Sequence, residues 1–68
     1  MPTRIFIVPT ASDIEAVEAI TAGLEQVVGV LRVDVTPHNG EVRVRYQKPA
    51  NETVLIQAIE AAGYPVTQ

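Results

Sequence analysis

Two stretches of the chain, residues 31–36 and 42–46, alternate apolar and polar residues, and this two-residue period predicts β-strands that each bury one face. A third strand is predicted at residues 3–8 by composition, because this stretch is rich in β-branched and aromatic side chains and stops at Pro9, which has no N–H to donate to a sheet. The residues expected to face inward from the two alternating strands are Leu31, Val33, Val35, Val42, Val44 and Tyr46.

Two other stretches repeat apolar residues every three or four positions, which is the spacing of one helix face. The first predicted helix covers residues 13–27, with Ser12 and Glu15 as a capping box at its start. The second begins after Asn51, a predicted N-cap. Each helix is followed by a glycine that favours a helix end, Gly29 and Gly63. The two apolar faces are expected to hold Ile14, Val17, Ile20, Leu24 and Val27, and Leu55, Ile56, Ile59 and Ala62.

The turns complete a β-α-β-β-α-β order. Asn39 and Gly40 predict a hairpin with positive φ at both residues, and residues 64–67 predict a short last strand, which Pro65 places at a sheet edge. This order predicts an α+β sandwich in which both helices cover one face of a four-stranded antiparallel sheet. Right-handed crossovers give the strand order 4-1-3-2. The 68 residues are expected to form a single domain, residues 1–68.

Composition supports a folded core and excludes several kinds of function. Apolar residues make up 47% of the chain and charged residues 19%, which separates it from disordered sequences. Because there is no cysteine, neither a disulfide nor a thiolate metal site can form. The net charge of −3 argues against a nucleic-acid partner, and no apolar run reaches the roughly 18 residues of a membrane span. We expect a soluble, cytoplasmic protein or a domain of a larger one.

The two signs of charge are segregated along the chain. All charged residues of the predicted helices are acidic, whereas the basic residues lie on predicted strands or the loop that follows them. The acidic set is Asp13, Glu15, Glu18, Glu25, Glu52 and Glu60, and the basic set is Arg4, Arg32, Arg43, Arg45 and Lys48. A negative helix layer and a positive sheet layer are therefore predicted, and the acidic layer could attract a basic protein partner.

The first strand also predicts a contact surface. If Phe6 faces the helices, Ile5 and Ile7 face outward, next to Arg43 and Arg45 of a neighbouring strand. Two isoleucines framed by arginines on an open sheet predict an interaction surface for a protein partner, an adjoining domain or a second copy in a homodimer.

The spacing of apolar and glycine residues resembles the heavy-metal-associated (HMA) domain family. The positions that carry the resemblance are Leu24, Gly29-Val30, Val33-x-Val35, Val44-x-Tyr46 and Leu55-Ile56-x-x-Ile59-Glu60-x-x-Gly63-Tyr64-x-Val66. The family includes copper chaperones, mercury-binding proteins and the N-terminal modules of metal-pumping ATPases. The resemblance covers essentially the whole chain and implies a ferredoxin-like βαββαβ fold with an origin in metal transport or detoxification.

The same resemblance shows where the chain departs from the family. The family segment Gly-Met-Thr-Cys-x-x-Cys falls on residues 10–16, so Asp13 and Ala16 stand at the two cysteine positions and Ala11 at the methionine. Soft thiolates are the ligands that capture Cu(I) or Hg(II), and neither replacement is soft. A Cu(I)-thiolate cofactor is therefore not expected. Tyr64 occupies a family position beside the metal loop.

Two alternatives remain open at this point. Asp13, Glu15 and His38 lie at one end of the predicted sandwich and could hold a harder ion such as Zn²⁺, although helix-dipole preference and turn chemistry also explain them. Alternatively, a dimer of this fold could act as a regulatory module that binds a small ligand between subunits. Because the sequence contains no nucleophile–base set and no phosphate loop, we predict a non-enzymatic domain that acts through protein contacts.

Overall fold

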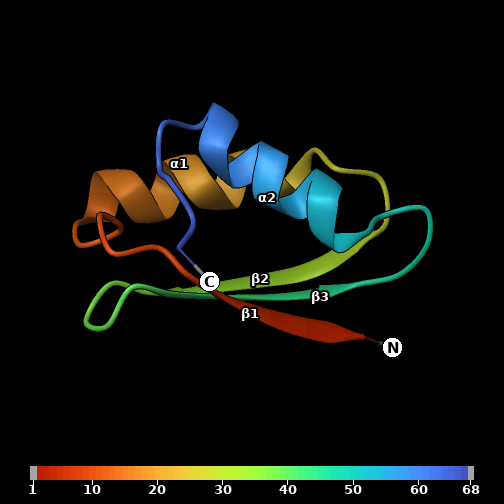
Figure 1. Ribbon diagram of the computed structural model, residues 1–68, viewed down its shortest axis with the longest axis horizontal. Helices are drawn as coiled ribbons and strands as arrows, with labels where there is room; N and C mark the ends of the chain where they lie inside the picture. The colour runs from red at the N-terminus through yellow and green to blue at the C-terminus, as the bar shows by residue number, and fades with distance from the viewer. Residues whose placement is uncertain (1, 68) are drawn as a thin grey trace.

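Two helices lie on one face of an antiparallel β-sheet in a computed structural model that describes residues 2–67 (Figure 1). The elements in chain order are β1 Thr3–Ile7, α1 Ile14–Glu25, β2 Val30–Thr36, β3 Glu41–Tyr46 and α2 Glu52–Ala61. The sheet order is β1-β3-β2, with β3 in the centre. The α+β class and the relative order of these three strands agree with the sequence prediction. Within the described residues, neither helix has the length and apolar character needed to cross a membrane.

The predicted fourth strand is not confirmed. Residues 64–67 form no strand, and the sheet has three strands within residues 2–67. Pro65 lacks an N–H, so this segment cannot build a continuous ladder. It still reaches β1 at one point, where the Thr67 N–H donates to the Ile7 carbonyl at 2.9 Å. The segment therefore lies beside β1, where the strand order 4-1-3-2 places it, without extending the sheet.

The core lies between the sheet and the helices, and β3 supplies its central strand. Val42 lies between Phe6 of β1 and Val35 of β2, and Val44 lies between Arg4 and Val33. Complete burial of such aliphatic or aromatic side chains stabilises a fold by about 1.5–3 kcal/mol each. The large side chains with no exposed surface are Phe6, Val8, Ile20, Leu24, Val42, Val44, Leu55 and Ile59.

Two residues predicted to be buried are exposed instead. Ile14 is 68% exposed because it is the first residue of α1, outside the part of the helix that covers the sheet, and the smaller Ala16 enters the core. Leu31 is 45% exposed because the pairing register of β2 and β3 shifts between Val30 and Arg32. This β-bulge interrupts the alternation, and Val30 packs against the core in place of Leu31.

Two predictions that involve glycine residues differ from the structure. Helix α1 ends at Glu25, before the predicted 27, and Gly29 lies beyond it with φ 103° against the loop at Gln47. In the β2–β3 hairpin only Gly40 has positive φ, at 73°, and Asn39 does not. The connection has four residues, 37–40, so it is not the two-residue turn in which both positions need positive φ.

Candidate functional site

The loop between β1 and α1 is held by backbone hydrogen bonds at the end of the molecule that also carries the hairpin (Figure 1). The Val8 N–H donates to the Gly40 carbonyl at 2.8 Å, which joins this loop to the hairpin. The Ala11 N–H then donates to Val8 at 3.0 Å, and the Ser12 N–H donates to Thr10 at 2.9 Å. The chain itself therefore fixes the path of the loop at the family's metal-binding position.

Asp13 is the N-cap of α1. Its backbone is extended (φ −136°, ψ 174°), and its Oδ1 accepts a hydrogen bond of 2.9 Å from the Ala16 N–H. The prediction of a capping box between Ser12 and Glu15 is wrong, because the helix begins one residue later than that pattern requires. Glu15 lies in the first turn, where its negative charge interacts favourably with the helix dipole.

The residues at the family's second cysteine position and at its methionine position are buried in the core. Ala16 has 1% of its surface exposed and Ala11 has none. A metal ligand that exchanges its ion with a partner must be accessible, and a methyl group offers no donor atom. The loop therefore contributes two methyl groups to the core at positions where the family has sulfur atoms.

The residues predicted as an alternative metal site are all exposed. Asp13 is used as the helix cap, Glu15 lies on the first turn and His38 lies in the hairpin loop. Within residues 2–67 the structure contains no group of three or more His, Asp or Glu side chains placed to hold a metal ion. The structure thus does not bring Asp13, Glu15 and His38 together as one set of ligands.

Tyr64 is half-buried after the end of α2. Its backbone N–H donates to the Ile59 carbonyl at 3.4 Å, and its side chain packs against the hydrophobic core. Packing accounts for Tyr64 at this position.

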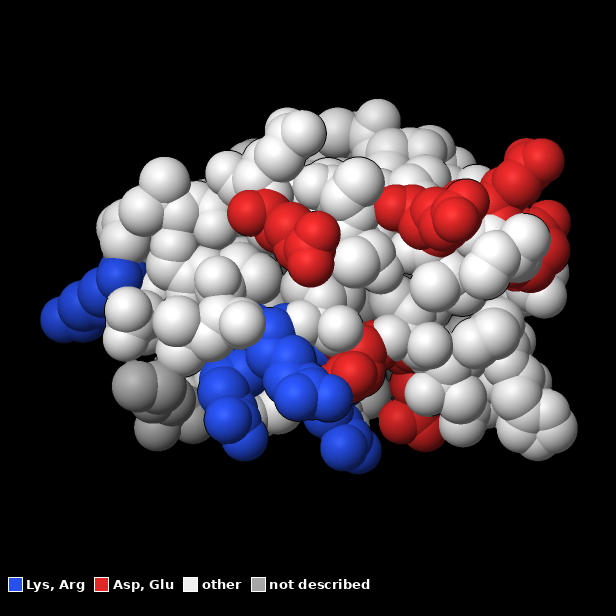
Figure 2. All heavy atoms as spheres, turned by 180° about the vertical axis from the view of Figure 1, so that it is seen from behind, with Lys and Arg blue, Asp and Glu red and all other residues white. Residues whose placement is uncertain are grey.

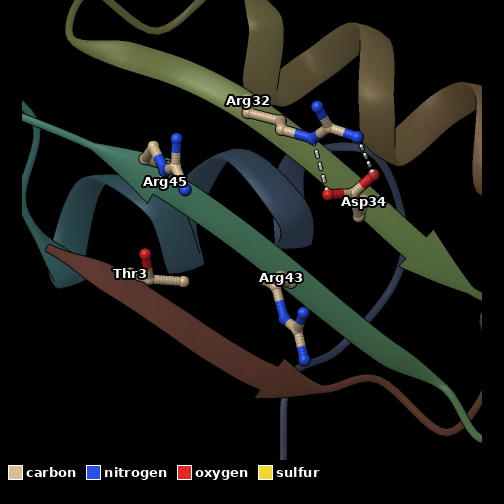
Figure 3. Close-up of a pocket in the computed structure, with 5 residues that line it drawn as sticks. All are labelled: Thr3, Arg32, Asp34, Arg43 and Arg45. Carbon is tan, nitrogen blue, oxygen red and sulfur yellow. Dashed lines mark hydrogen bonds and ion pairs between the residues drawn. The ribbon is translucent and has the colours of Figure 1, made fainter. Parts of the chain in front are cut away.

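A polar hollow of about 290 Å³ lies on the sheet face opposite the helices (Figure 3). Strand β1 contributes one lining residue, and β2 and β3 contribute two each. The five residues are Thr3, Arg32, Asp34, Arg43 and Arg45. Three guanidinium groups and one carboxylate therefore share an open surface on three adjacent strands.

An exposed ion pair occupies the β2 side of this hollow. Arg32 Nε donates to Asp34 Oδ2 at 2.9 Å, and Arg32 Nη2 lies 3.5 Å from Asp34 Oδ1 (Figure 3). The hydrogen bond from Arg32 lowers the pKa of Asp34 below its ordinary value of 3.8, and the positive charges of Arg43 and Arg45 act in the same direction. The same hydrogen bond raises the pKa of Arg32. Asp34 is therefore held in its charged form.

The predicted interaction surface lies on this face. Ile5 is 43% exposed and pairs with Arg43 across the strands, while Ile7 is half-buried and pairs with Glu41. Arg43 and Arg45 are exposed and form no ion pair with another described residue. Sequence reasoning did not include Thr3, Arg32 and Asp34 in this surface. The sequence does indicate Arg32 and Asp34 as surface residues, because they alternate with apolar positions of a predicted strand and must point outward.

Charge separation between the layers is visible on the surface of the molecule. In Figure 2 acidic side chains spread over the helix side and basic side chains gather along the sheet side, where acidic side chains are also present. Asp34 on β2 and Glu41 on β3 are the acidic residues of the sheet. An ion pair joins the two layers, since Arg4 Nη1 lies 3.2 Å from Glu52 Oε1. The Arg4 guanidinium also lies 5.8 Å from the centre of the Phe6 ring. Arg4 thus belongs to the helix side of β1 and does not add to the positive charge of the open face.

Solved structures of metal-handling proteins are similar to this chain over nearly its whole length. A CopZ metallochaperone is 30% identical, with a TM-score of 0.93 and coverage of 97% of this chain and 100% of that one. Oxidized MerP from Ralstonia metallidurans CH34 is 27% identical (TM-score 0.88, coverage 98% and 97%), and apo-CopP from Helicobacter pylori is 26% identical (TM-score 0.89, coverage 97% and 100%). No protein-family model and no curated protein matches the chain.

The fold, the whole-length similarity and the spacing of the loop together define the class of this protein. The chain belongs to the heavy-metal-associated domain family. Within that family it is a member with a degenerate CxxC motif, because Asp13 and Ala16 replace both cysteines and no other cysteine is present.

Proposed function

We propose that this chain is a non-enzymatic HMA domain linked to metal transport or detoxification, that its thiol metal site has been lost, and that it acts through contacts with other proteins. The similarity to metallochaperones and to MerP supports the link to metal handling. A location in the cytoplasm stays a prediction from the sequence.

The hydrogen bond between Asp13 and Ala16 is the observation that carries this proposal. It uses the carboxylate at the first thiol position to organise the start of α1, which is a role that needs no ion. The side chain at the second thiol position is a buried methyl group. Since the loop is ordered by the chain itself and offers no soft donor, capture of Cu(I) has no ligand set to act through.

Two surfaces support a role in protein contact. The open sheet face combines the exposed Ile5 with the free guanidinium groups of Arg43 and Arg45, which suits a partner or adjoining domain that carries carboxylates. The helix layer is acidic and suits a basic partner. Arginine is enriched at protein interfaces, and the buried centre of an interface is more apolar than the rest of the surface.

Metal binding can be tested by competition with a coloured Cu(I) chelator and by calorimetry with Zn²⁺ and Cu²⁺. The matched control is the double variant Asp13→Cys/Ala16→Cys, which places thiols at both cysteine positions of the family. Circular dichroism checks that this variant is folded, because it removes the cap of α1 and changes a buried side chain. We expect the control to take Cu(I) from the chelator and the native chain to leave it there. Tight stoichiometric binding by the native chain, abolished by Asp13→Ala or His38→Ala, would overturn the proposal.

The contact surface can be tested with a poly-glutamate peptide as an acidic probe. We expect NMR shift changes at Arg43 and Arg45 and their loss in the double variant Arg43→Gln/Arg45→Gln. Lys48→Gln, on the loop after β3, is the control and should keep binding. An interaction that maps to α1 or α2, or that survives in the double variant, would contradict the assignment of this face.

A further inference from the structure

Strand β2 has an open edge. It pairs with β3 on one side, and no described strand lies on the other. An open edge presents backbone N–H and C=O groups that can pair with another strand, and proteins usually block such edges with charges or bulges. Strand β2 carries both features, the bulge at Leu31 and the charges of Arg32 and Asp34.

The order of residues in β2 makes it complementary to itself. Around Val33 the sequence reads Leu31-Arg32-Val33-Asp34-Val35. In an antiparallel pair centred on Val33, Arg32 lies opposite Asp34 of the second copy, and Asp34 lies opposite its Arg32. Opposite charges at directly paired positions stabilise a sheet, so the charges that block other partners favour this register.

The surroundings of Arg32 are compatible with the same pairing. Arg32 lies directly opposite Arg45 on β3, so its neighbour on that strand has the same charge, and its carboxylate within the copy is Asp34 of the same strand, at 2.9 Å. A second copy supplies a further carboxylate on the other side.

We propose that two copies of this chain associate through antiparallel pairing of their β2 strands about Val33. A two-fold axis perpendicular to the sheet then joins three strands from each copy into one continuous sheet. Both pairs of helices lie on one side of it, and Arg43 and Arg45 of both copies lie on the other. The contact involves one short strand from each copy, so the dimer is weak and concentration-dependent. This inference goes beyond the proposed function and does not depend on metal binding.

Sedimentation velocity from about 10 µM to about 1 mM, without metal, tests the association. We expect a monomer–dimer equilibrium that Arg32→Asp weakens by about 10-fold or more, because two attractive cross-strand pairs become repulsive. The double variant Arg32→Asp/Asp34→Arg exchanges the charges and should restore dimerisation. Lys48→Asp changes the net charge as Arg32→Asp does, lies outside β2 and should leave the equilibrium unchanged.

Circular dichroism checks that each variant is folded, and NMR shifts on dilution locate the contact. Changes confined to residues 31–35 support the proposal. A chain that stays monomeric at the highest concentration overturns it, as do dilution shifts centred on the β1–α1 loop or on Ile5 and Ile7. Failure of the folded double variant to regain dimerisation also overturns it. Each result is independent of the metal titrations, so this inference and the proposed function can fail separately.

Discussion

Asp13 Oδ1 lies 2.9 Å from the backbone nitrogen of Ala16, so a hydrogen bond joins the two positions at which the family carries its cysteines. The N–H groups of the first turn of a helix have no partner within the helix, and this contact satisfies one of them. The start of α1 therefore depends on the carboxylate of Asp13.

Replacement of Asp13 by Ala should lower the free energy of unfolding by about 1 kcal/mol, the usual cost of a lost N-cap. Urea unfolding followed by circular dichroism measures the change. Ser12→Ala and Glu15→Ala are the controls and should each stay within about 0.5 kcal/mol, because neither side chain forms the cap. A loss at Ser12 or Glu15 as large as that at Asp13 would instead support the capping box.

Replacement of Gly40 by Ala should destabilise the chain by about 1–3 kcal/mol through strain at an unfavourable backbone conformation. Gly40 has φ 73°, and a Cβ there would lie 2.6 Å from the Val8 carbonyl oxygen, in the contact that joins the hairpin to the β1–α1 loop. Gly63→Ala is the matched control. It also has positive φ, at 99°, but its Cβ would have no atom within 4 Å. Equal losses of stability in Gly40→Ala and Gly63→Ala, measured by thermal unfolding, would show that the contact with Val8 contributes nothing to the destabilisation.

The carboxyl group of Asp34 should titrate below its ordinary value of 3.8. Its pKa is lowered in the folded state, so the stability it contributes is present above the unfolded value and is lost as pH falls through the lower folded value. An NMR titration of the side-chain carboxyl measures the pKa directly. Arg32→Gln should move it upward, and added salt should have a smaller effect in the same direction. An unchanged pKa in Arg32→Gln would exclude the ion pair as the main cause.

Amide hydrogen exchange should distinguish three ordered strands from four. The Thr67 N–H, held by one bond to Ile7, should exchange much faster than the amide of Val44 in the centre of the sheet. Protection of Thr67 comparable to that of Val44 would show that the C-terminal segment pairs with β1 as a full strand.

Periodicity predicted the elements well because it reports burial directly. The alternation of Val42 and Val44 and the helical spacing of Ile20 and Leu24 mark the faces that enter the core, and the structure buries all four. The outward position of Arg43 follows from the same alternation. These features can be predicted because they depend only on the local sequence and on the burial of one side of each element.

The remaining details depend on contacts between distant parts of the chain. Ser12 and Asp13 are both good N-caps, and the choice depends on Ala16 entering the core, which no local pattern reveals. The exposure of Leu31 comes from a bulge in the pairing of β2 with β3. The hollow beside Asp34 likewise requires the strand order, because its five residues come from three strands.

The separation of charge between the two layers has a consequence for how this molecule approaches others. A domain whose carboxylates lie mostly on one side and whose guanidinium groups lie mostly on the other experiences a torque near a charged surface, in addition to any net attraction. This torque acts within about one Debye length, roughly 10 Å at moderate salt. The domain therefore rotates before it makes contact with that surface. It turns its sheet toward an acidic surface and its helices toward a basic surface. A larger fraction of collisions then begins in an orientation that can lead to binding.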